Sequence, residues 1–305
     1  MLNPHFKKYE KHGDDCLVYN IDKLPNTDIP SLKSLSWAPI LKSLKFPENR
    51  IKRIFIRSKI TDDGVRTPQV EQIFGDETPG SSIVTHKDNG ITYKFDLNLN
   101  MFSRGNIQEK IRMSKIDHKM TSFADLYSGI GYFSLQIMKE NVNLVKVSLF
   151  EWNPNAVKFN KINVELNFRK KNPGIIERTK FYPGDNRMTV IDPENCDLEH
   201  NHDRIMMGLI PCSCGSLKSA AYLSRLPCLI HVHHNIDQSI ETIDPARLPE
   251  LYSKDCVVTS SKNYPEQIGE KLAEFRGCNY EVQHVQKVKS YGPKVNHMVI
   301  DVLLF

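Results

Sequence analysis

The amino-acid sequence predicts an α/β protein: a mostly parallel, doubly wound sheet in its longer C-terminal part and a small α+β domain before it. After about residue 106, short apolar runs typical of strands alternate with helical segments, an order that favours a parallel sheet with helices on both faces. Before that point, two adjacent strand-like runs flank a tight turn. We therefore expect two domains, residues 1–97 and 98–305.

The N-terminal domain shows strand signals from about residue 50 onward. Residues 1–30 are polar and irregular, and we expect them to be loosely held. The run RIFIRSKI (53–60) alternates apolar and polar residues, as a strand does. Ser82–His86 and Ile91–Leu97 are separated by Lys87-Asp88-Asn89-Gly90, which predicts a β-hairpin.

The C-terminal domain contains seven strand-like segments interleaved with helices. The last two strands follow each other directly, so we expect them to form an antiparallel edge of the sheet. The expected strands are 122–127, 145–152, 179–182, 204–209, 228–234, 281–288 and 297–304. The expected helices are 107–118, 132–140, 154–167, 216–225 and 265–276.

Composition excludes several classes of protein. A chain of 305 residues with 40% hydrophobic and 25% charged residues is neither disordered nor fibrous. It has no run of 18 apolar residues, so we expect no transmembrane helix and no membrane partner. Seven cysteines without a signal peptide indicate reduced thiols in a cytoplasmic protein. We expect a monomer, although no sequence feature determines the oligomeric state. Because no C-x-x-C pair is present, we also expect no metal.

Positive charge is concentrated near the N-terminus. The net charge is +5, and residues 1–120 hold 20 basic against 15 acidic residues. The densest stretch runs from Lys42 to Lys59 and has either a polyanionic partner or only solvent around it. Besides Lys42 and Lys45, its basic residues are Arg50, Lys52, Arg53, Arg57 and Lys59.

A glycine turn between the first strand and helix of the C-terminal domain is the first candidate site. The strand ends at Asp125, and Gly129 and Gly131 then allow a sharp turn with close backbone approach to a ligand. Glu151 closes the next strand, 20 residues after Gly131, where a carboxylate can accept hydrogen bonds from a ribose diol. This order favours an adenosine cofactor; a structural turn beside a surface glutamate is the alternative.

The cofactor is either a nicotinamide dinucleotide or S-adenosyl-L-methionine. Ser134 occupies the third small position of the dinucleotide fingerprint and does not exclude it. An acidic loop after the third strand, with Asp185 and Asn186, instead suits an adenine amino group. The loop Gly208–Pro211 after the fourth strand leaves room for a substrate beside the cofactor. With the final antiparallel strand pair, these features favour a Rossmann-like class I methyltransferase fold.

Six ordered motifs resemble one family closely. The chain is similar to the tRNA wybutosine-synthesising protein 2 family, which is related to the tRNA guanine N-1 methyltransferases, over roughly residues 66–305, including VKSYGPKVNHMVIDV (288–302). The motifs are FDLNLNMFSRGNIQEKIRM (95–113), DLYSGIGYFSL (125–135), EWNPNAVKFNKINVELN (151–167), GDNR (184–187), DRIMMGLIP (203–211) and HVHHN (231–235).

The resemblance implies transfer of the 3-amino-3-carboxypropyl group of S-adenosyl-L-methionine to C-7 of 4-demethylwyosine at position 37 of tRNA(Phe). It also implies that Ser103 and Lys110 contact the methionine end of the cofactor, that Glu151 holds the ribose, and that Asp185 with Asn186 holds the adenine. With tRNA as the substrate, the small N-terminal domain would contact it through the basic residues Arg50, Lys52, Arg53, Arg57 and Lys59. Arg104 would contact a phosphate or the cofactor carboxylate, and Tyr291 would line the target-base pocket. Because the sulfonium is already activated, positioning should dominate the catalysis, and no general base is named.

Two rival functions remain open at this point. One is a tRNA guanine N-1 methyltransferase on the same fold, and the other is a non-catalytic tRNA-binding scaffold. The fifth strand offers a second hypothesis, a metal site: His231 and His233 share a face of this strand and could bind a metal together with Cys212 or Cys214. We favour the alternative in which the histidines of this strand lie beside the substrate.

Overall fold

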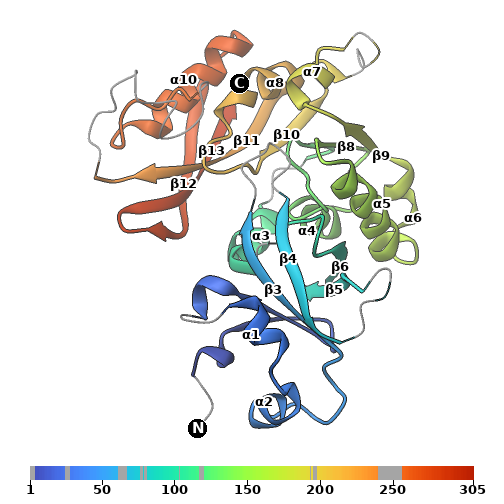
Figure 1. Cartoon of the computed structure of the whole chain (residues 1–305). Coiled ribbons are helices and arrows are strands. Elements are labelled where there is room, and N and C mark those ends of the chain that lie inside the picture. Colours follow the sequence, from blue (N-terminus) through green and yellow to red (C-terminus); the bar gives the residue numbers. More distant parts are fainter. Residues whose placement is uncertain are drawn as a thin grey trace. The chain divides into compact units, whose positions relative to one another are not determined.

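The computed structural model divides the chain into two compact units, Met1–Ser103 and Arg104–Phe305, against an expected division between residues 97 and 98. Each unit is described by itself. The structure describes residues 4–24, 28–60, 67–75, 78, 81–102, 104–116, 120–192, 194, 198–239 and 256–305. Figure 1 shows the elements of both units along the chain.

The first unit is a small α+β domain. Its four-stranded sheet has the order β1-β2-β3-β4, in which β2 and β3 run parallel and the other pairs antiparallel. A separate hairpin joins β5 and β6 through Asn89 and Gly90, both with positive φ, as predicted. The elements are η1 (Pro4–Lys7), β1 (Tyr9–His12), β2 (Cys16–Asn20), η2 (Ile21–Lys23), α1 (Ile29–Lys33), α2 (Trp37–Ser43), β3 (Arg53–Ile60), β4 (Pro68–Phe74), β5 (Ile83–Asp88) and β6 (Ile91–Asp96).

The expectation that residues 1–30 are loosely held is wrong for the described residues 4–24 and 28–30. Strand β2 lies inside the sheet, and Leu17 and Tyr19 belong to the core of this unit with Trp37 and Ile54. The short apolar run at 16–19 is stabilised by pairing with β3, more than thirty residues further along the chain. Sequence periodicity over so few residues does not reveal a strand whose stability comes from a distant partner.

The second unit contains a seven-stranded sheet of order β12-β13-β11-β10-β7-β8-β9. The five strands from β11 to β9 run parallel, whereas β13 is antiparallel to both β11 and β12. All seven strands and the antiparallel edge formed by the last two were predicted; the structure places β13 between β11 and the edge strand β12. They are β7 (Ser122–Asp125), β8 (Lys146–Glu151), β9 (Thr179–Pro183), β10 (His202–Met207), β11 (Ser224–Asp237), β12 (Tyr280–Gly292) and β13 (Val295–Leu304).

Helices cover both faces of this sheet, so the doubly wound prediction is confirmed. Ile300 and Val302 of β13 pack into the same core as Ile268 and Leu272 of α10. Asp301 points to the opposite face, where it pairs with Arg112 of α3. The helical elements are η3 (Arg104–Asn106), α3 (Ile107–Lys115), α4 (Ser134–Glu140), α5 (Pro154–Phe168), α6 (Pro173–Glu177), α7 (Asn186–Thr189), η5 (Cys214–Ser216), α8 (Leu217–Leu223) and α10 (Tyr264–Arg276).

Alternation along the strands decides which side chains meet. Successive residues of a strand point to opposite faces, so His231 and His233 lie on the α3 face while Val232 and His234 lie on the face of α8 and α10. Among the residues that the structure describes, no helix has the length and apolarity needed to cross a membrane.

Candidate adenosine-cofactor site

The turn after β7 has the geometry that its glycines predict. Gly129 and Gly131 have φ values of +54° and +98°, which side chains with a Cβ rarely adopt. A Cβ on Gly131 would lie 2.6 Å from Leu135 Cγ and 3.0 Å from Asn160 Oδ1. The turn therefore requires glycine both for its backbone conformation and for its close packing against α4 and α5.

Glu151 stands at the carboxyl end of β8 and faces this turn. Its Oε2 accepts a 2.7 Å hydrogen bond from the Gly129 N–H, and its Oε1 accepts one of 2.7 Å from the Asn153 N–H. Burial raises the pKa of Glu151, although these backbone donors oppose the shift. A carboxylate offers about four acceptor positions, so those that the backbone donors leave open can accept from a ribose hydroxyl.

Asp125, the last residue of β7, stabilises the glycine turn through hydrogen bonds. It is buried, and its carboxyl group accepts hydrogen bonds from the Ser134 hydroxyl at 2.6 Å and the Tyr127 N–H at 3.1 Å. Burial raises its pKa to about 7, and the neighbouring Glu151 adds to the increase while the two hydrogen bonds oppose it. These bonds tie the end of β7 to the first residue of α4.

Two asparagines of α5, which the sequence analysis missed, bind the turn from the other side. Asn160 Nδ2 donates to Ser128 Oγ and to the Gly129 carbonyl oxygen, both at 3.1 Å. Asn163 Nδ2 donates to the Ile130 carbonyl oxygen at 3.0 Å. Both side chains are fully buried. Amides spaced three residues apart on the apolar face of a helix were the available signal, because buried amides require partners.

The loop after β9 holds Asp185 and Asn186 in different ways. Asp185 caps α7 and forms an ion pair with Arg187 at 2.6 Å, which lowers its pKa. Asn186 is buried; its Nδ2 donates to the Leu126 carbonyl oxygen at 2.9 Å, and its Oδ1 accepts from Ser216 Oγ at 2.6 Å. Asn186 thus connects this loop to the glycine turn, and the adenine contacts of both residues stay predictions.

Lys110 lies on α3, a helix that packs against α4, and its side chain is 1% exposed. The charge of an ammonium suits a carboxylate, which is the basis of its predicted role at the methionine end of the cofactor. The predicted neighbour Ser103 lies outside the described residues, as do the side chains of Arg104 and Tyr291. The roles of these residues therefore stay predictions.

A buried charge network lies beneath α3. Arg112 pairs with Glu109 at 2.7 Å and with Asp301 at 2.6 Å, and Asp301 also accepts from His231 Nδ1 at 2.7 Å. Arg204 donates to His231 Nε2 at 2.8 Å, so the ring proton of neutral His231 must be on Nδ1. Burial lowers the pKa of His231 to about 4, in keeping with a neutral ring. The network attaches α3 to the sheet.

The basic cluster of the first unit is partly neutralised. Arg53 binds both oxygens of Asp15 at 3.0 Å, and Arg57 pairs with Glu10 at 2.6 Å. Arg50 pairs with Asp14 at 2.7 Å but remains exposed. Lys42, Lys45 and Lys52 are also exposed, whereas the side chain of Lys59 lies outside the described part. Arg53 and Arg57 thus hold β3 to the β1–β2 region, and contact of the exposed cations with a polyanion stays a prediction.

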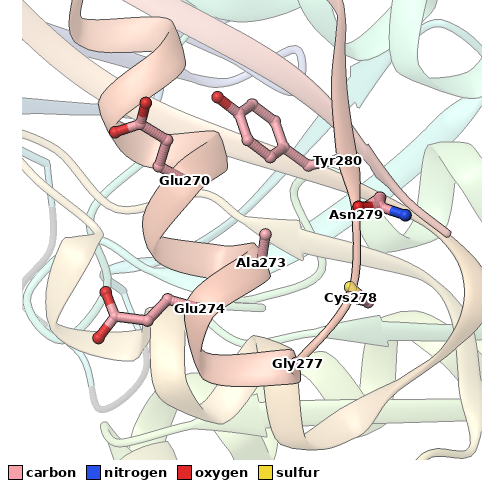
Figure 2. A pocket seen from close by; sticks show the side chains of 7 residues that line it. All are labelled: Glu270, Ala273, Glu274, Gly277, Cys278, Asn279 and Tyr280. Carbon is pink, nitrogen blue, oxygen red and sulfur yellow. The ribbon is translucent and has the colours of Figure 1, made fainter.

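A surface hollow of about 470 Å³ lies elsewhere in the second unit (Figure 2). It is lined by residues from the end of α10 to the start of β12, including Glu270, Glu274 and Cys278. Tyr280 is opposite Leu304 of β13, which in turn is opposite Cys228 near the start of β11. The hollow is therefore at the amino end of the parallel strands and four strands from β7, so it is not part of the glycine-turn site.

The sheet order, the glycine turn and the carboxylate at the end of the second parallel strand define a class of protein. They are the features of a Rossmann-like class I methyltransferase domain, in which an adenosine cofactor binds at the carboxyl ends of the strands. The model of the TRM5/TYW2 methyltransferase domain matches residues 84–259. The chain belongs to the TRM5/TYW2 family.

Individual relatives agree with this assignment. The chain is 32% identical to a tRNA wybutosine-synthesizing protein 2 homolog of Danio rerio, over 96% of this chain and 70% of that protein. It shares the fold of P. horikoshii TYW2, solved in complex with MeSAdo, with a TM-score of 0.67 and 24% identity over 98% of this chain and 91% of that one. It also shares the fold of M. jannaschii TYW2, solved in complex with AdoMet, with a TM-score of 0.63 and 22% identity over 97% and 99%.

Proposed function

We propose that this chain is an S-adenosyl-L-methionine-dependent transferase that moves the 3-amino-3-carboxypropyl group to C-7 of 4-demethylwyosine at position 37 of tRNA(Phe). The observation that carries the proposal is the glycine turn closed by Glu151 in a chain similar over nearly its full length to a tRNA wybutosine-synthesizing protein 2 homolog. We further propose that it acts as a cytoplasmic monomer.

The residues present fit an adenosine cofactor. The Gly129–Glu151 bond holds the carboxylate in place while leaving acceptor capacity for a ribose hydroxyl. Lys110 and Ser103 are proposed to hold the carboxylate at the methionine end, where an ammonium and a hydroxyl suit its charge. When bound, the cofactor supplies a sulfonium whose three carbons are open to a nucleophile.

Positioning decides which of those carbons reacts. The loop after β10 reads Gly208-Leu209-Ile210-Pro211, where amino-group methyltransferases often have Asn or Asp before two prolines to hold an amine. A Cβ on Gly208 would make only an ordinary van der Waals contact, 3.6 Å, with the ring of the buried Phe133. The loop thus offers no polar side chain to hold an exocyclic amine, which argues against methylation of such an amine. Transfer to a carbon is supported by the similarity to tRNA wybutosine-synthesizing protein 2 homologs.

The product of the reaction tests this function. The chain is incubated with S-adenosyl-L-methionine and tRNA(Phe) from cells blocked before this step, and the modified nucleoside is analysed by mass spectrometry. We expect the mass of an aminocarboxypropyl group to be added. Addition of a methyl group would instead identify a tRNA guanine N-1 methyltransferase, and an unchanged nucleoside would support a binding scaffold.

Replacement of Glu151 tests the cofactor site separately. Glu151→Gln keeps the shape but removes the charge that strengthens hydrogen bonds to the ribose, so the Kd for S-adenosylhomocysteine should rise roughly 10- to 100-fold. Isothermal titration calorimetry measures the change. Glu165→Gln, which removes a partly exposed carboxylate of α5, is the matched control and should bind normally. Equal affinities for all three proteins would place the ribose elsewhere.

A further inference from the structure

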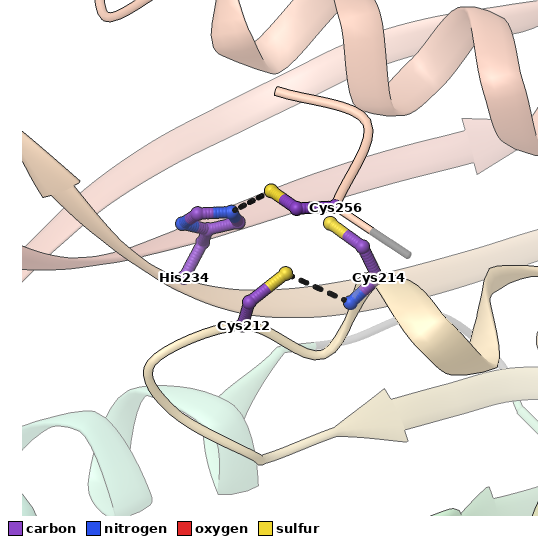
Figure 3. A group of neighbouring side chains, drawn as sticks. All are labelled: Cys212, Cys214, His234 and Cys256. Carbon is purple, nitrogen blue, oxygen red and sulfur yellow. Dashed lines mark hydrogen bonds between the residues drawn. The ribbon is translucent and has the colours of Figure 1, made fainter. Parts of the chain in front are cut away.

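Four side chains of the types that bind metal ions lie close together on the α8–α10 side of the sheet, outside the cofactor site (Figure 3). They are Cys212, Cys214, His234 and Cys256, and their ligand atoms all lie within 4.8 Å of one another. All four are buried: His234 is 0% exposed and the most accessible, Cys256, is 7% exposed. The three cysteines are free thiols. This set is referred to below as the Cys3His cluster.

The fold brings these residues together from three segments. The loop after β10 pairs with β11, where Cys212 forms an antiparallel bridge with His234 and the Asn235 N–H donates to the Pro211 carbonyl oxygen at 2.7 Å. Residues directly opposite in such a pair point to the same side of the sheet. Cys214 follows two residues later in η5, and Cys256 arrives from the segment that precedes α10.

Hydrogen bonds prepare the cluster to act as ligands. His234 Nδ1 bonds to the Asn235 carbonyl oxygen at 2.8 Å, so Nδ1 must carry the proton and Nε2 presents a lone pair. That Nε2 lies 3.4 Å from Cys256 Sγ, and Cys212 Sγ accepts from the Cys214 N–H at 3.3 Å. A backbone carbonyl behind the histidine and an N–H donor to a cysteine sulfur are the outer contacts usual around protein metal sites.

We propose that the Cys3His cluster binds one zinc ion at a structural site. Tetrahedral zinc, with bonds of about 2.3 Å to sulfur and 2.0 Å to nitrogen, separates its ligands by roughly 3.5–3.8 Å, so closing the cluster requires side-chain shifts of only about 1 Å. Three thiolates and one imidazole favour zinc over hard cations such as Mg²⁺. With four protein ligands and full burial, the ion has no open position for a substrate.

The zinc ion would fix the loop after β10 to the segment before α10. Thr259, three residues after Cys256, already binds α10 through its N–H to Gln267 Oε1 at 2.9 Å. The same loop contains Gly208 and Pro211, where we expect the substrate to lie beside the cofactor. Zinc would therefore hold this loop in position without taking part in the transfer.

The sequence predicts no metal, and the zinc proposal departs from that expectation. The alternative metal site formed by His231 and His233 with Cys212 or Cys214 is wrong. Strand alternation places those two histidines on the α3 face, where His231 binds Asp301 and His233 Nδ1 lies 2.9 Å from His297 Nε2. His234 is the residue that faces the cysteines. The sequence spacing hid the site because its ligands are separated by 2, 20 and 22 residues and the last follows a long connection.

Metal analysis of the intact chain tests the proposal. Protein purified from zinc-supplemented cells without chelator should contain about one zinc ion per chain by mass spectrometry. After removal of zinc under reducing conditions, added Co²⁺ should give the sulfur-to-cobalt charge-transfer and visible bands of a tetrahedral thiolate site. A wild-type chain that contains no zinc and gives no such cobalt spectrum overturns the proposal, as does a disulfide between any two of the three cysteines.

Single replacements assign the ligands. Cys214→Ser and His234→Ala should each lose most of the bound zinc and weaken the cobalt bands, whereas Cys278→Ser, which removes a cysteine at the surface hollow, should retain both. If a ligand variant does not fold, the wild-type cobalt spectrum still decides the question. Chelation should also lower the Tm of the wild type but not that of a variant already lacking zinc. Equal zinc content in Cys214→Ser and Cys278→Ser would contradict the assignment.

Discussion

Asp125 makes the stability of the cofactor domain depend on pH. Burial raises its pKa to about 7, above the usual value of 3.8. Its contribution is therefore fully present below about pH 4 and is lost as the pH rises through about 7. Asp125→Asn removes this titration, so its free energy of unfolding relative to wild type should increase between pH 4 and 7.5 by on the order of 1–4 kcal/mol.

Urea unfolding at a series of pH values measures this difference. Asp14→Asn serves as the control, because Asp14 is a surface carboxylate whose pKa is lowered by Arg50 and Lys11. A lowered pKa has the opposite sign, so Asp14→Asn should not gain stability relative to wild type between pH 4 and pH 7.5. Parallel pH profiles for Asp125→Asn and wild type would show that Asp125 is ionised throughout this range in the folded protein.

At the level of single residues, sequence reasoning works where a local motif defines the position. Asp125 and Glu151 end successive strands, and the structure places both at the glycine turn. Arg53 and Arg57 were predicted to contact tRNA, yet their partners Asp15 and Glu10 lie 38 and 47 residues away in the sequence. Net charge in a stretch of sequence shows that cations are present but not whether a distant carboxylate already binds them.

Helix α5 stabilises the conformation of the glycine turn through the side-chain amide of Asn160. Asn160→Ala removes both hydrogen bonds to Ser128 and Gly129 and leaves the Gly129 carbonyl oxygen without that donor. The free energy of unfolding should fall by about 1–3 kcal/mol. Because Gly129 also binds Glu151, affinity for S-adenosylhomocysteine should fall too.

Chemical denaturation and calorimetry check both parts of this expectation. Lys158→Ala, an exposed position on the same helix, is the control for a general effect on α5 and should change neither quantity. Loss of stability with unchanged cofactor affinity would show that the turn keeps its conformation without the Asn160 amide. Unchanged stability would mean that water replaces the amide.

An element was predictable from the sequence when its own residues carry the strand or helix pattern, and not when a distant partner strand stabilises it. The five parallel strands of the large sheet are apolar runs that alternate with helical segments, and β12 and β13 follow the last helix in succession, so each strand was predicted from its own segment. Strands β1 and β2 were missed because β1 pairs only with β2, and β2 pairs with β3, more than thirty residues further along the chain. Strand β4 was missed as well, since PQVEQIF alternates weakly and its partner residues on β3 determine its register.

The two units of the whole molecule contribute different parts of the proposed reaction. Every described residue of the glycine-turn site belongs to the unit Arg104–Phe305, whereas the exposed cations Lys42, Lys45 and Lys52 belong to Met1–Ser103. Cofactor binding and tRNA binding should therefore respond to different substitutions. The overall division was visible in the sequence because strand–helix alternation begins only after the first unit.

Salt dependence tests the tRNA role of the first unit. Each lysine that neutralises a phosphate releases counterions, so log Kobs for tRNA should fall linearly with log salt concentration, by roughly 0.7–0.9 per neutralised phosphate. Replacement of Lys42, Lys45 and Lys52 by alanine should weaken tRNA binding and make this slope shallower by about one unit for each phosphate that no longer has a lysine partner. The Kd for S-adenosylhomocysteine should stay unchanged, because these residues are outside the cofactor unit.

The control must separate a local effect from net charge. A second triple variant, with alanine at Lys158, Lys170 and Lys171, removes the same charge from exposed positions of the second unit. Fluorescence anisotropy with tRNA(Phe) at several salt concentrations gives both slopes. If the two triple variants show the same decrease in affinity and slope, tRNA responds to the overall charge of the chain. A selective decrease in the first variant locates phosphate binding on the Lys42–Lys52 stretch, since these lysines are exposed whereas Arg53 and Arg57 are already neutralised by carboxylates.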